Sequence, residues 1–521
     1  MPDDAGPSGP IANPTYMADI RNFFTPDDVN HMAPKGYDLA TYDGVKDNAS
    51  DIYGQTQAGN MPPPPAEPWS ADKVQTFLNW MTNGFALGSA TAPVVEPSSP
   101  TNGVTASRVR KNVASLSDEE LTTLKAAFTG LMARDPSDPG SYYALAGIHW
   151  LPGGWDGVNG RCQHHINGFN PWHRVFLKGF EDALRTVPGC EEVTLPYWDI
   201  STPLPDPLRE EPFASYTLQE DPAANIRPNP GYFPGSTTRY TPEEIEANLV
   251  DRGFASDTAT SLQQSRWGVY SNSGPATPGN PNGGSGYQQF SIQAHDSGHV
   301  SIGDWMANQD IAAFDPVFWF YHCNLDRLWL QWQRNAGAET LIGFKSTLGA
   351  NTAWLSPPIN GLSPFSPPAL TPATTTDETI EFGISYDDQD LESVEELALE
   401  NTTGSIDAAR SFSIKSTTPV SVRVKNIDRL NIPGSFDVHL LADGKVIAKR
   451  ALFQPTSPRD CETCKSVALI SLDFRIEQEK LLDKQLSVEI HVPGHKDIGT
   501  KFPLSKAGNP TINARLLLHE E

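Results

Sequence analysis

The sequence predicts a large, mainly α-helical domain followed by a small antiparallel β-sandwich. Helix start signals and apolar residues at helical spacing recur up to about residue 335, whereas beyond residue 411 apolar and polar residues alternate between turn residues. A Pro/Ser/Thr-rich stretch over 355–378 separates the two patterns and is typical of a linker or extended strap. We therefore expect the first domain over 1–390, a linker over 391–410 and the sandwich over 411–521.

Composition and charge exclude several classes of function. The 38 Lys and Arg against 63 Asp and Glu give a net charge of -25, so nucleic acid and anionic membrane surfaces would be repelled. The sequence has no run of 18 apolar residues, and its start, MPDDAGPSGP, lacks the basic and apolar regions of a signal peptide. We expect a soluble protein, cytoplasmic as written, whose oligomeric state the sequence leaves open.

Four helices carry the expectation of a helical domain. The first 105 residues or so contain one amphipathic helix after Ser70, and the rest of them is expected to form loops. Ser117 and Glu120 make a capping box before a strongly periodic segment. Asn170-Pro171 and Asp315-Pro316 each place an N-cap residue before a proline at the first helical position.

The histidines are the main indication of chemistry. Seven of the 12 fall within one third of the chain, whereas the five cysteines are an odd number at irregular spacing, which argues against a disulfide framework. His295 and His299 are four residues apart and would share one helix face, as a metal site requires. His322, about two turns into the next helix, would complete a first set of three.

A second set of three is available from His149, His164 and His173. Six neutral imidazoles without carboxylate ligands favour copper over magnesium, calcium or a hydrolytic zinc pair. Asn324 and Asp326 follow His322 and are candidates for orienting the ligands.

Two stretches resemble known copper-binding motifs. HHINGFNPWHRVFLKGFEDALR resembles the first motif of the tyrosinase, catechol oxidase and hemocyanin superfamily, and HDSGHVSIGDWM followed by DPVFWFYHCNLDRLWLQWQ resembles the second. The similarity covers about 105–330 well and 380–521 more loosely. It implies a tyrosinase-like helical core at about 105–335 that binds two copper ions per chain. The ligands so implied are His149, His164 and His173 for the first copper, and His295, His299 and His322 for the second.

The resemblance also implies roles for neighbouring residues. Cys162 stands two residues before His164, an arrangement that in many members becomes a thioether between the cysteine sulfur and the histidine ring; otherwise Cys162 is a buried thiol. The motif spacing selects His164 over His165, which we expect to make a local hydrogen bond. Phe318 resembles a phenylalanine that packs between the second-copper histidines, and Gln309 belongs to the region expected to shape the substrate pocket.

Two departures from the family pattern bear on the reaction. Tyr321 precedes His322 where the family often has a second histidine. Many hydroxylating members carry a glutamate shortly before the first histidine of the second motif, but no Glu lies between Glu246 and His295 here. Asp296 is therefore the candidate catalytic residue, either as a general base or as a group that only orients His295, and the two roles stay open.

The function implied is a type-3 copper polyphenol oxidase, an enzyme that uses O2 to oxidise o-diphenols to quinones; whether it also hydroxylates monophenols stays open. The main alternative is an oxygen carrier like a hemocyanin unit, which shares the six histidines but shields them from phenols. A binuclear zinc hydrolase is disfavoured because such sites normally use bridging carboxylates. Small phenols and O2 are thus the expected partners.

The C-terminal domain resembles the covering domain of related proenzymes. Phe453 precedes Cys461 and Cys464 at about the spacing seen in some fungal proenzymes, where the aromatic ring fills the substrate position and the cysteine pair is thought to pass copper inward. Thiolates suit Cu(I), which gives that transfer a chemical basis. The alternative is that Phe453 is a core residue of the sandwich and the cysteines form a local disulfide or have no role.

Overall fold

The computed structural model describes residues 108–152, 164–220, 232–271, 290–348, 419–492 and 501–516, short pieces between them, and parts of 10–85. Its contacts divide the chain into two units, Met1–Asn102 and Gly103–Glu521. The first 102 residues thus form a unit of their own, although the sequence analysis placed them in one domain over 1–390.

The first unit is a small helical body with an aromatic core. Its elements are η1 (Ile20–Phe23), α2 (Tyr42–Asp47), α3 (Ala49–Gln57) and α4 (Ala71–Thr82). Helix α4 is the helix predicted after Ser70, and its Phe77 and Trp80 are fully buried. The Trp80 ring lies against those of Tyr16 and Tyr42, each with a centroid distance of 6.0 Å. We expected loops in place of α2 and α3, whose short, polar sequences lack a clear apolar period.

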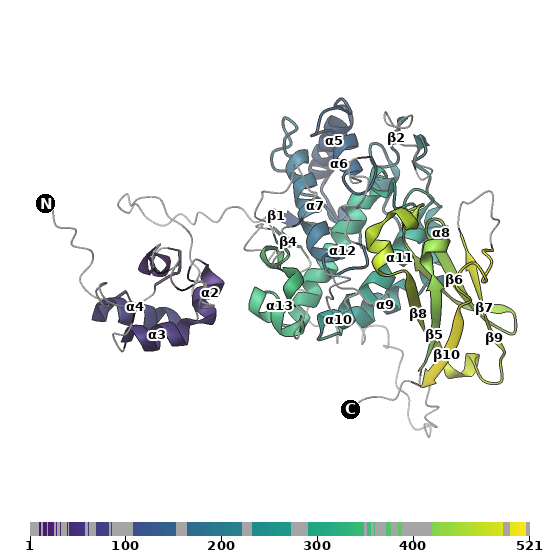
Figure 1. The fold of residues 1–521 in the computed structure, drawn as a ribbon. Helices are drawn as coiled ribbons and strands as arrows, with labels where there is room; N and C mark the ends of the chain where they lie inside the picture. Colours follow the sequence, from purple (N-terminus) through teal and green to yellow (C-terminus); the bar gives the residue numbers. More distant parts are fainter. Residues whose placement is uncertain are drawn as a thin grey trace, which may run out of the picture. The chain divides into compact units, whose positions relative to one another are not determined.

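The helices of the second unit (Figure 1) pack around one large apolar core and a smaller second cluster. Helix α5 (Asp118–Met132) begins with the predicted capping box of Ser117 and Glu120. Helix α12 (Val317–Asn335) begins one residue later than predicted, after Pro316, although the Asp315 carboxylate still accepts a hydrogen bond from the Val317 N–H at 3.0 Å. The predicted cap of α7 (Phe169–Leu184) was wrong: the helix starts after Gly168, and Asn170 lies inside its first turn.

The remaining elements of this part are shorter or more peripheral. They are η3 (Val113–Ser115), α6 (Tyr142–Gly147), η4 (Asp206–Arg209), β2 (Thr217–Leu218), β3 (Gly235–Ser236), α8 (Pro242–Asp251), α9 (Phe254–Leu262), α10 (Trp267–Tyr270), α11 (Phe290–Ile302), η5 (Ala312–Phe314), α13 (Leu341–Leu348), η6 (Ala353–Leu355) and η7 (Ala373–Thr375). Helices α7 and α12 pack through a parallel stack of Phe180 on Trp319, with centroids 3.5 Å apart. This contact fixes the two helices side by side.

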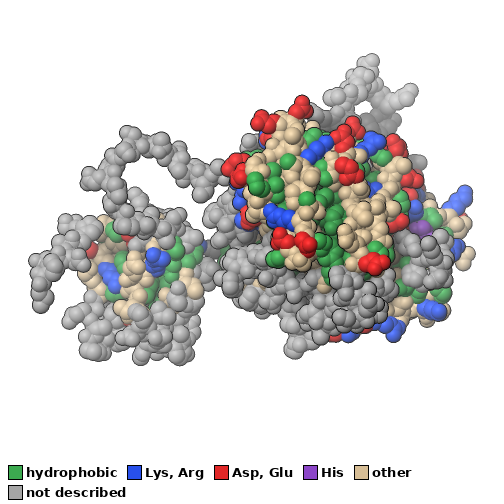
Figure 2. All heavy atoms as spheres, turned by 90° about the horizontal axis from the view of Figure 1, so that it is seen from above, with side chains coloured by type: hydrophobic (Ala, Val, Ile, Leu, Met, Phe, Trp, Pro, Cys, Tyr) green, Lys and Arg blue, Asp and Glu red, His purple; other side chains and the backbone are tan. Residues whose placement is uncertain are grey.

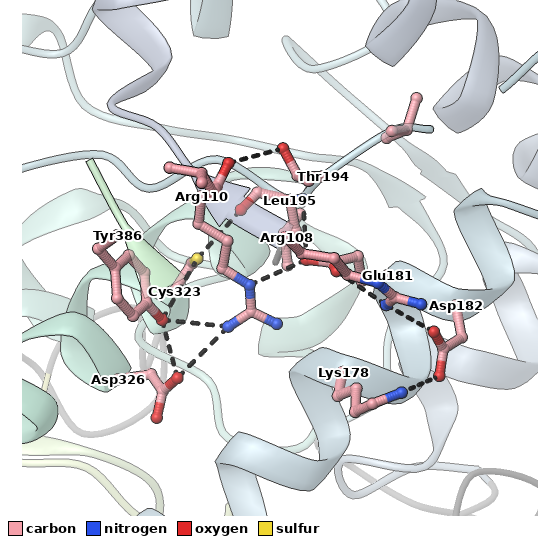
Figure 3. Close-up of polar contacts among 12 residues, drawn as sticks. Arg108, Arg110, Lys178, Glu181, Asp182, Thr194, Leu195, Cys323, Asp326 and Tyr386 are labelled. Carbon is pink, nitrogen blue, oxygen red and sulfur yellow. Dashed lines mark hydrogen bonds and ion pairs between the residues drawn. The ribbon is translucent and has the colours of Figure 1, made fainter. Parts of the chain in front are cut away.

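A buried charge cluster fastens the end of the helical region to this core (Figure 3). Strand β1 (Arg108–Arg110) pairs in parallel with β4 (Ile384–Tyr386). The Arg110 guanidinium bonds Glu181 at 2.9 Å and Asp326 at 3.3 Å, and the Tyr386 hydroxyl donates to Asp326 at 2.8 Å. Asp326 also accepts from Arg174 at 2.7 Å. Asp326, which the sequence suggested as a residue that orients copper ligands, is instead the counter-ion of two buried guanidinium groups.

The C-terminal region consists of two antiparallel sheets. One has the order β10–β5–β8 and the other β7–β6–β9. Their strands are β5 (Pro419–Asp428), β6 (Phe436–Ala442), β7 (Lys445–Leu452), β8 (Leu469–Glu477), β9 (Leu486–His491) and β10 (Thr511–Leu516), and the connections contain η9 (Arg429–Asn431), η10 (Pro458–Asp460), α15 (Glu462–Ser466) and η11 (Gln478–Lys480). Alternate residues of both sheets, such as Val422 and Val438, share one apolar core. The predicted fold class, mainly helical with a separate sheet region, is confirmed.

The sheets dock on the helical region through β7, which lies against α11. Buried ion pairs hold this interface: Arg252 bonds Asp437 at 2.7 Å and Arg450 bonds Asp257 at 3.0 Å. Elsewhere, Figure 2 shows acidic and basic side chains interspersed over the described part of one face. Among the described residues, no helix is long and apolar enough to cross a membrane.

Candidate metal centre

Three histidines from the α6 end, a loop and α7 form the first group. His149 follows α6, His164 lies in the loop before α7, and His173 lies in the first turns of α7. All three are buried, and each offers one ring nitrogen within 4.8 Å of the nitrogens of the other two. The fold therefore brings together the three residues that were predicted to bind the first copper.

The second group comes from two neighbouring helices. His295 and His299 lie one turn apart on α11, and His322 lies on α12. Their ligand atoms also fall within 4.8 Å of one another, and the Nε2 atoms of His299 and His322 are only 2.9 Å apart. The two groups face each other: the rings of His173 and His322 stack at 4.6 Å, and those of His164 and His295 are 5.3 Å apart. This is the arrangement of a binuclear centre.

In three of the rings a hydrogen bond on Nδ1 leaves Nε2 for a metal. Nδ1 of His173 donates to the Phe169 carbonyl and Nδ1 of His299 to the Met306 carbonyl, both at 2.8 Å. Nδ1 of His295 donates to Asp296 at 2.8 Å. Such bonds fix the tautomer in which Nε2 carries the lone pair.

The donor set fits two copper ions. Nε2 of His295 is buried without a hydrogen-bond partner in the described structure, and a bound metal would satisfy this nitrogen, which is otherwise costly to bury. Burial, followed by the repulsion of neighbouring histidines, lowers the pKa of His149 to about 3 and holds the pKa values of His164, His299 and His322 well below their usual value. The rings are therefore neutral near pH 7, as ligands must be. Six neutral imidazoles suit copper.

A glycine allows α11 and α12 to approach. A Cβ atom on Gly298 would lie 2.1 Å from the Tyr321 hydroxyl oxygen, far inside contact distance. That hydroxyl donates to the His295 carbonyl at 2.9 Å, and the Tyr321 ring stands edge-on to His299 with centroids 5.2 Å apart. Tyr321, the departure from the family pattern, thus packs directly against the two ligands of α11.

Asp296 lies at the centre of a buried polar chain. Its two carboxylate oxygens bond His295 Nδ1 at 2.8 Å and His165 Nε2 at 3.0 Å. Burial alone would raise the pKa of Asp296, but the two histidines outweigh it and lower that pKa. His165 has a φ of 60°, a left-handed conformation. His165 is absent from both groups of ligands. Its ring bonds Asp296 and Arg429, which are distant in the chain, where a local hydrogen bond was predicted.

The other predicted site residues differ in their surroundings. Phe318 packs on His322 at 4.1 Å and on His149 at 4.8 Å, between the two groups. The Gln309 backbone lies beside His149, and the Gln309 side chain lines a small cavity. Asn324 accepts hydrogen bonds from Arg327 at 3.0 and 2.8 Å. Cys162 lies outside the described residues, so the thioether stays a prediction.

Phe453, at the end of β7, lies over the centre. Its fully buried ring stacks on His299 with centroids 3.9 Å and planes 15° apart, and meets His164 edge-on at 5.2 Å. From the sequence, Phe453 was either a ring in the substrate position or a core residue of the sandwich. Its ring contacts are with histidines of both groups, which favours the first role.

The cysteine pair lies close by. Cys461 and Cys464 are buried, unpaired thiols, which excludes the alternative of a local disulfide. They line the same small cavity as Gln309, and the wall of that cavity also includes His164, His165 and Arg429. Sequence reasoning missed Arg429, because nothing in VKNIDRLNIP marks an arginine that becomes fully buried beside the centre.

Comparison with known proteins agrees with this geometry. The family model for the common central domain of tyrosinase matches residues 139–335. The chain is 29% identical to tyrosinase HcTyr1 of Hahella sp. (strain CCB-MM4) over 265 residues, which cover 45% of this chain and 55% of that protein. It is 30% identical to the A-type hemocyanin, units Ode to Odg, of Enteroctopus dofleini over 241 residues, or 43% of this chain and 18% of that protein.

The fold has counterparts among solved structures as well. A tyrosinase from Burkholderia thailandensis superposes with a TM-score of 0.58 at 20% identity, over 78% of this chain and 100% of that one. Fold and site together define a type-3 copper protein. Residues 139–335 match the central domain common to tyrosinases, and the chain is similar to both tyrosinases and hemocyanins. The chain spans about half the length of HcTyr1 and a smaller share of the hemocyanin.

Proposed function

We propose that the protein is a latent phenol oxidase, which oxidises o-diphenols to o-quinones with O2 once Phe453 leaves the copper centre. The observation that carries the proposal is the parallel stack of Phe453 on His299 at 3.9 Å. An aromatic ring held flat against a ligand imidazole occupies the kind of space that a phenol ring would need. An apolar pocket of that shape, next to redox metals, favours a phenol as the molecule that displaces it.

The ligand residues account for how the chain would support the reaction. Two bound copper ions would supply the redox chemistry, in which two diphenols and one O2 give two quinones and two waters. The six imidazoles hold the ions, and the carbonyls of Phe169 and Met306 fix two of the rings. Phe318 fills the space between the two groups and keeps it free of bulk water.

We assign Asp296 a positioning role instead of that of a general base. Both of its oxygens already accept hydrogen bonds, from His295 and His165, so neither is directed at a substrate proton. We therefore propose diphenol oxidation as the main reaction, with monophenol hydroxylation slower.

Latency fits the way the C-terminal sheets are attached. The segment 388–418, outside the described residues, joins β4 to β5, and its sequence offers sites for proteolysis. A cut there would leave Tyr386 in its buried cluster with the helical core and would free the sheets that carry Phe453. The cysteine pair would serve in copper transfer to the centre, because its thiols share a cavity with the ligand His164.

An oxygen carrier is the second candidate, and the hemocyanin match is the observation that favours it. One experiment distinguishes the two. The copper-loaded chain carries an engineered protease site within 388–418, and O2 uptake with catechol is measured before and after cutting. Quinone formation only after cutting supports the latent oxidase. Reversible O2 binding without quinone in the cut protein would mean a carrier.

A pair of variants tests the role of Phe453 in the uncut chain. Phe453→Ala empties the stacked position, and we expect it to oxidise catechol without proteolysis. Leu452→Ala is the matched control, since Leu452 is equally buried but belongs to the core between the sheets. Equal activity of the two variants would show that catechol reaches the copper centre because the domain is loosened, and not because the phenyl ring is removed.

A further inference from the structure

A second cluster of metal-ligating side chains lies on the C-terminal sheets. His439 of β6 and Glu489 and His491 of β9 each offer a ligand atom within 4.8 Å of the others. All three are partly exposed, in contrast to the buried copper ligands. The cluster belongs to the antiparallel pair β6–β9 and shares no residue with the binuclear centre.

The strand register explains why the three side chains meet. His439 is paired directly with Glu489, and Asp437 with His491. Side chains two residues apart on a strand project from the same face, so Glu489 and His491 share the face of His439. Directly opposite residues have Cβ atoms about 5 Å apart, within reach of a shared ion. The backbone therefore holds the donors in place before any ligand arrives.

The side-chain contacts fit a shared ligand. The imidazole rings of His439 and His491 stack at 4.0 Å with planes 18° apart, and Nε2 of His491 lies 3.0 Å from Glu489 Oε2.

The surrounding charges are balanced. Lys501 bonds the other Glu489 oxygen at 2.7 Å, and Lys449, opposite His439 on β7, is neutralised by Asp251 at 2.6 Å. Arg252 and Asp437 pair with each other at the same face. Of these groups, only Lys501 competes directly with a cation for a ligand of the cluster.

We propose that His439, Glu489 and His491 form a surface site for one borderline divalent cation of the Zn²⁺ or Cu²⁺ class, separate from the binuclear centre. Two imidazoles and one carboxylate are the ligand set of such ions, whereas Mg²⁺ and Ca²⁺ require oxygen donors. The bound ion links β6 to β9 across their hydrogen-bonded edge. Since Asp437 on β6 holds Arg252 of the helical region, the ion also braces the strand that anchors the interface.

Zn²⁺ binding to the full-length chain, with its binuclear centre already loaded with copper, tests the proposal by isothermal titration calorimetry. We expect one Zn²⁺ per chain, lost in His439→Ala and in His491→Ala and weakened in Glu489→Gln. Lys501→Ala should bind Zn²⁺ more tightly, because Glu489 no longer shares its charge. His519→Ala is the control for general loss of a histidine and should bind as the parent does.

Copper content, measured in the same samples, should stay at two ions in every variant. Absence of Zn²⁺ binding by the parent, or its retention in both single histidine variants, overturns the site. Unchanged affinity in both Glu489→Gln and Lys501→Ala overturns the assignment of Glu489 as a ligand.

Discussion

Arg429 reaches His165 across the interface between the sheets and the helical core: its Nη1 lies 3.2 Å from Nδ1 of His165, 264 residues away in the chain. The guanidinium only donates, so His165 Nδ1 must accept, and the His165 proton lies on Nε2, which bonds Asp296. Asp296 in turn fixes His295. Arg429, a residue of the C-terminal region, thereby fixes the tautomer of His165. Through Asp296 this hydrogen-bonded chain ends at His295, one of the proposed copper ligands.

Arg429 also faces the cysteine pair, with Nη2 3.6 Å from Cys464 Sγ. Burial alone would raise the pKa of Cys464, but the hydrogen bond with Cys461 and the charge of Arg429 lower it. We expect Arg429→Met to raise that pKa, measured from the thiolate absorbance of the metal-free protein against pH. Arg423→Met, which removes a sheet arginine paired with Asp473, is the control. An identical titration in both variants would contradict the role of Arg429.

His322→Ala should lose copper, whereas His165→Ala should keep both ions. His322 is one of six imidazoles in the two groups, while the ring nitrogens of His165 bond Asp296 and Arg429. Metal analysis of the purified variants gives the ratio of copper to protein. Two ions per chain in His322→Ala would be incompatible with the binuclear assignment.

Asp296→Asn should weaken copper binding by roughly 10–100-fold, the usual effect of removing a group that orients a metal-bound histidine. An amide can accept from only one of the two imidazole N–H groups that the carboxylate now serves. Competition with a copper chelator at equilibrium measures the affinity, and Asp304→Asn, at an exposed position of the same region, is the control. Unchanged affinity with lost activity would instead favour the general base.

The copper ligands were predictable and the polar chain was not, for a physical reason. Each ligand motif is local, since a helix places His295 and His299 on one face whatever surrounds it. The contact from Arg429 to His165 exists only after two separately built regions dock. The role of Asp326 was misjudged likewise, because proximity in sequence to His322 said nothing of Arg110 and Arg174, which arrive from other elements.

Asp326→Asn should lower the free energy of unfolding by about 3–5 kcal/mol, because it leaves buried guanidinium groups without full compensation. The matched control is Asp182→Asn in the same cluster (Figure 3), where the side chain is 44% exposed and an ion pair contributes at most about 1 kcal/mol. Urea denaturation of both variants measures the difference. Similar losses would mean that burial does not set the strength of these pairs.

Asp310 should make stability depend on pH. Burial raises its pKa to about 6 although it accepts a hydrogen bond from the Thr456 N–H at 3.2 Å. The pKa of Asp310 is therefore higher in the folded protein than in the unfolded chain, and the neutral carboxyl favours folding. The free energy of unfolding should be highest below pH 4 and should fall by about 3 kcal/mol as the pH rises through 6. Asp310→Asn should therefore gain stability relative to the parent between pH 4 and 7 in urea denaturation. Exposed Asp460→Asn should show no such trend.

The contact between Gly298 and Tyr321 has a consequence for how this centre can evolve. Any side chain at 298 collides with the Tyr321 ring, so substitutions at the two positions are epistatic. A path that first shortens residue 321 opens space for a larger residue at 298, whereas the reverse order passes through an intermediate with displaced helices. Mutational histories of this pair should therefore run in one direction, with the change at 321 always coming first.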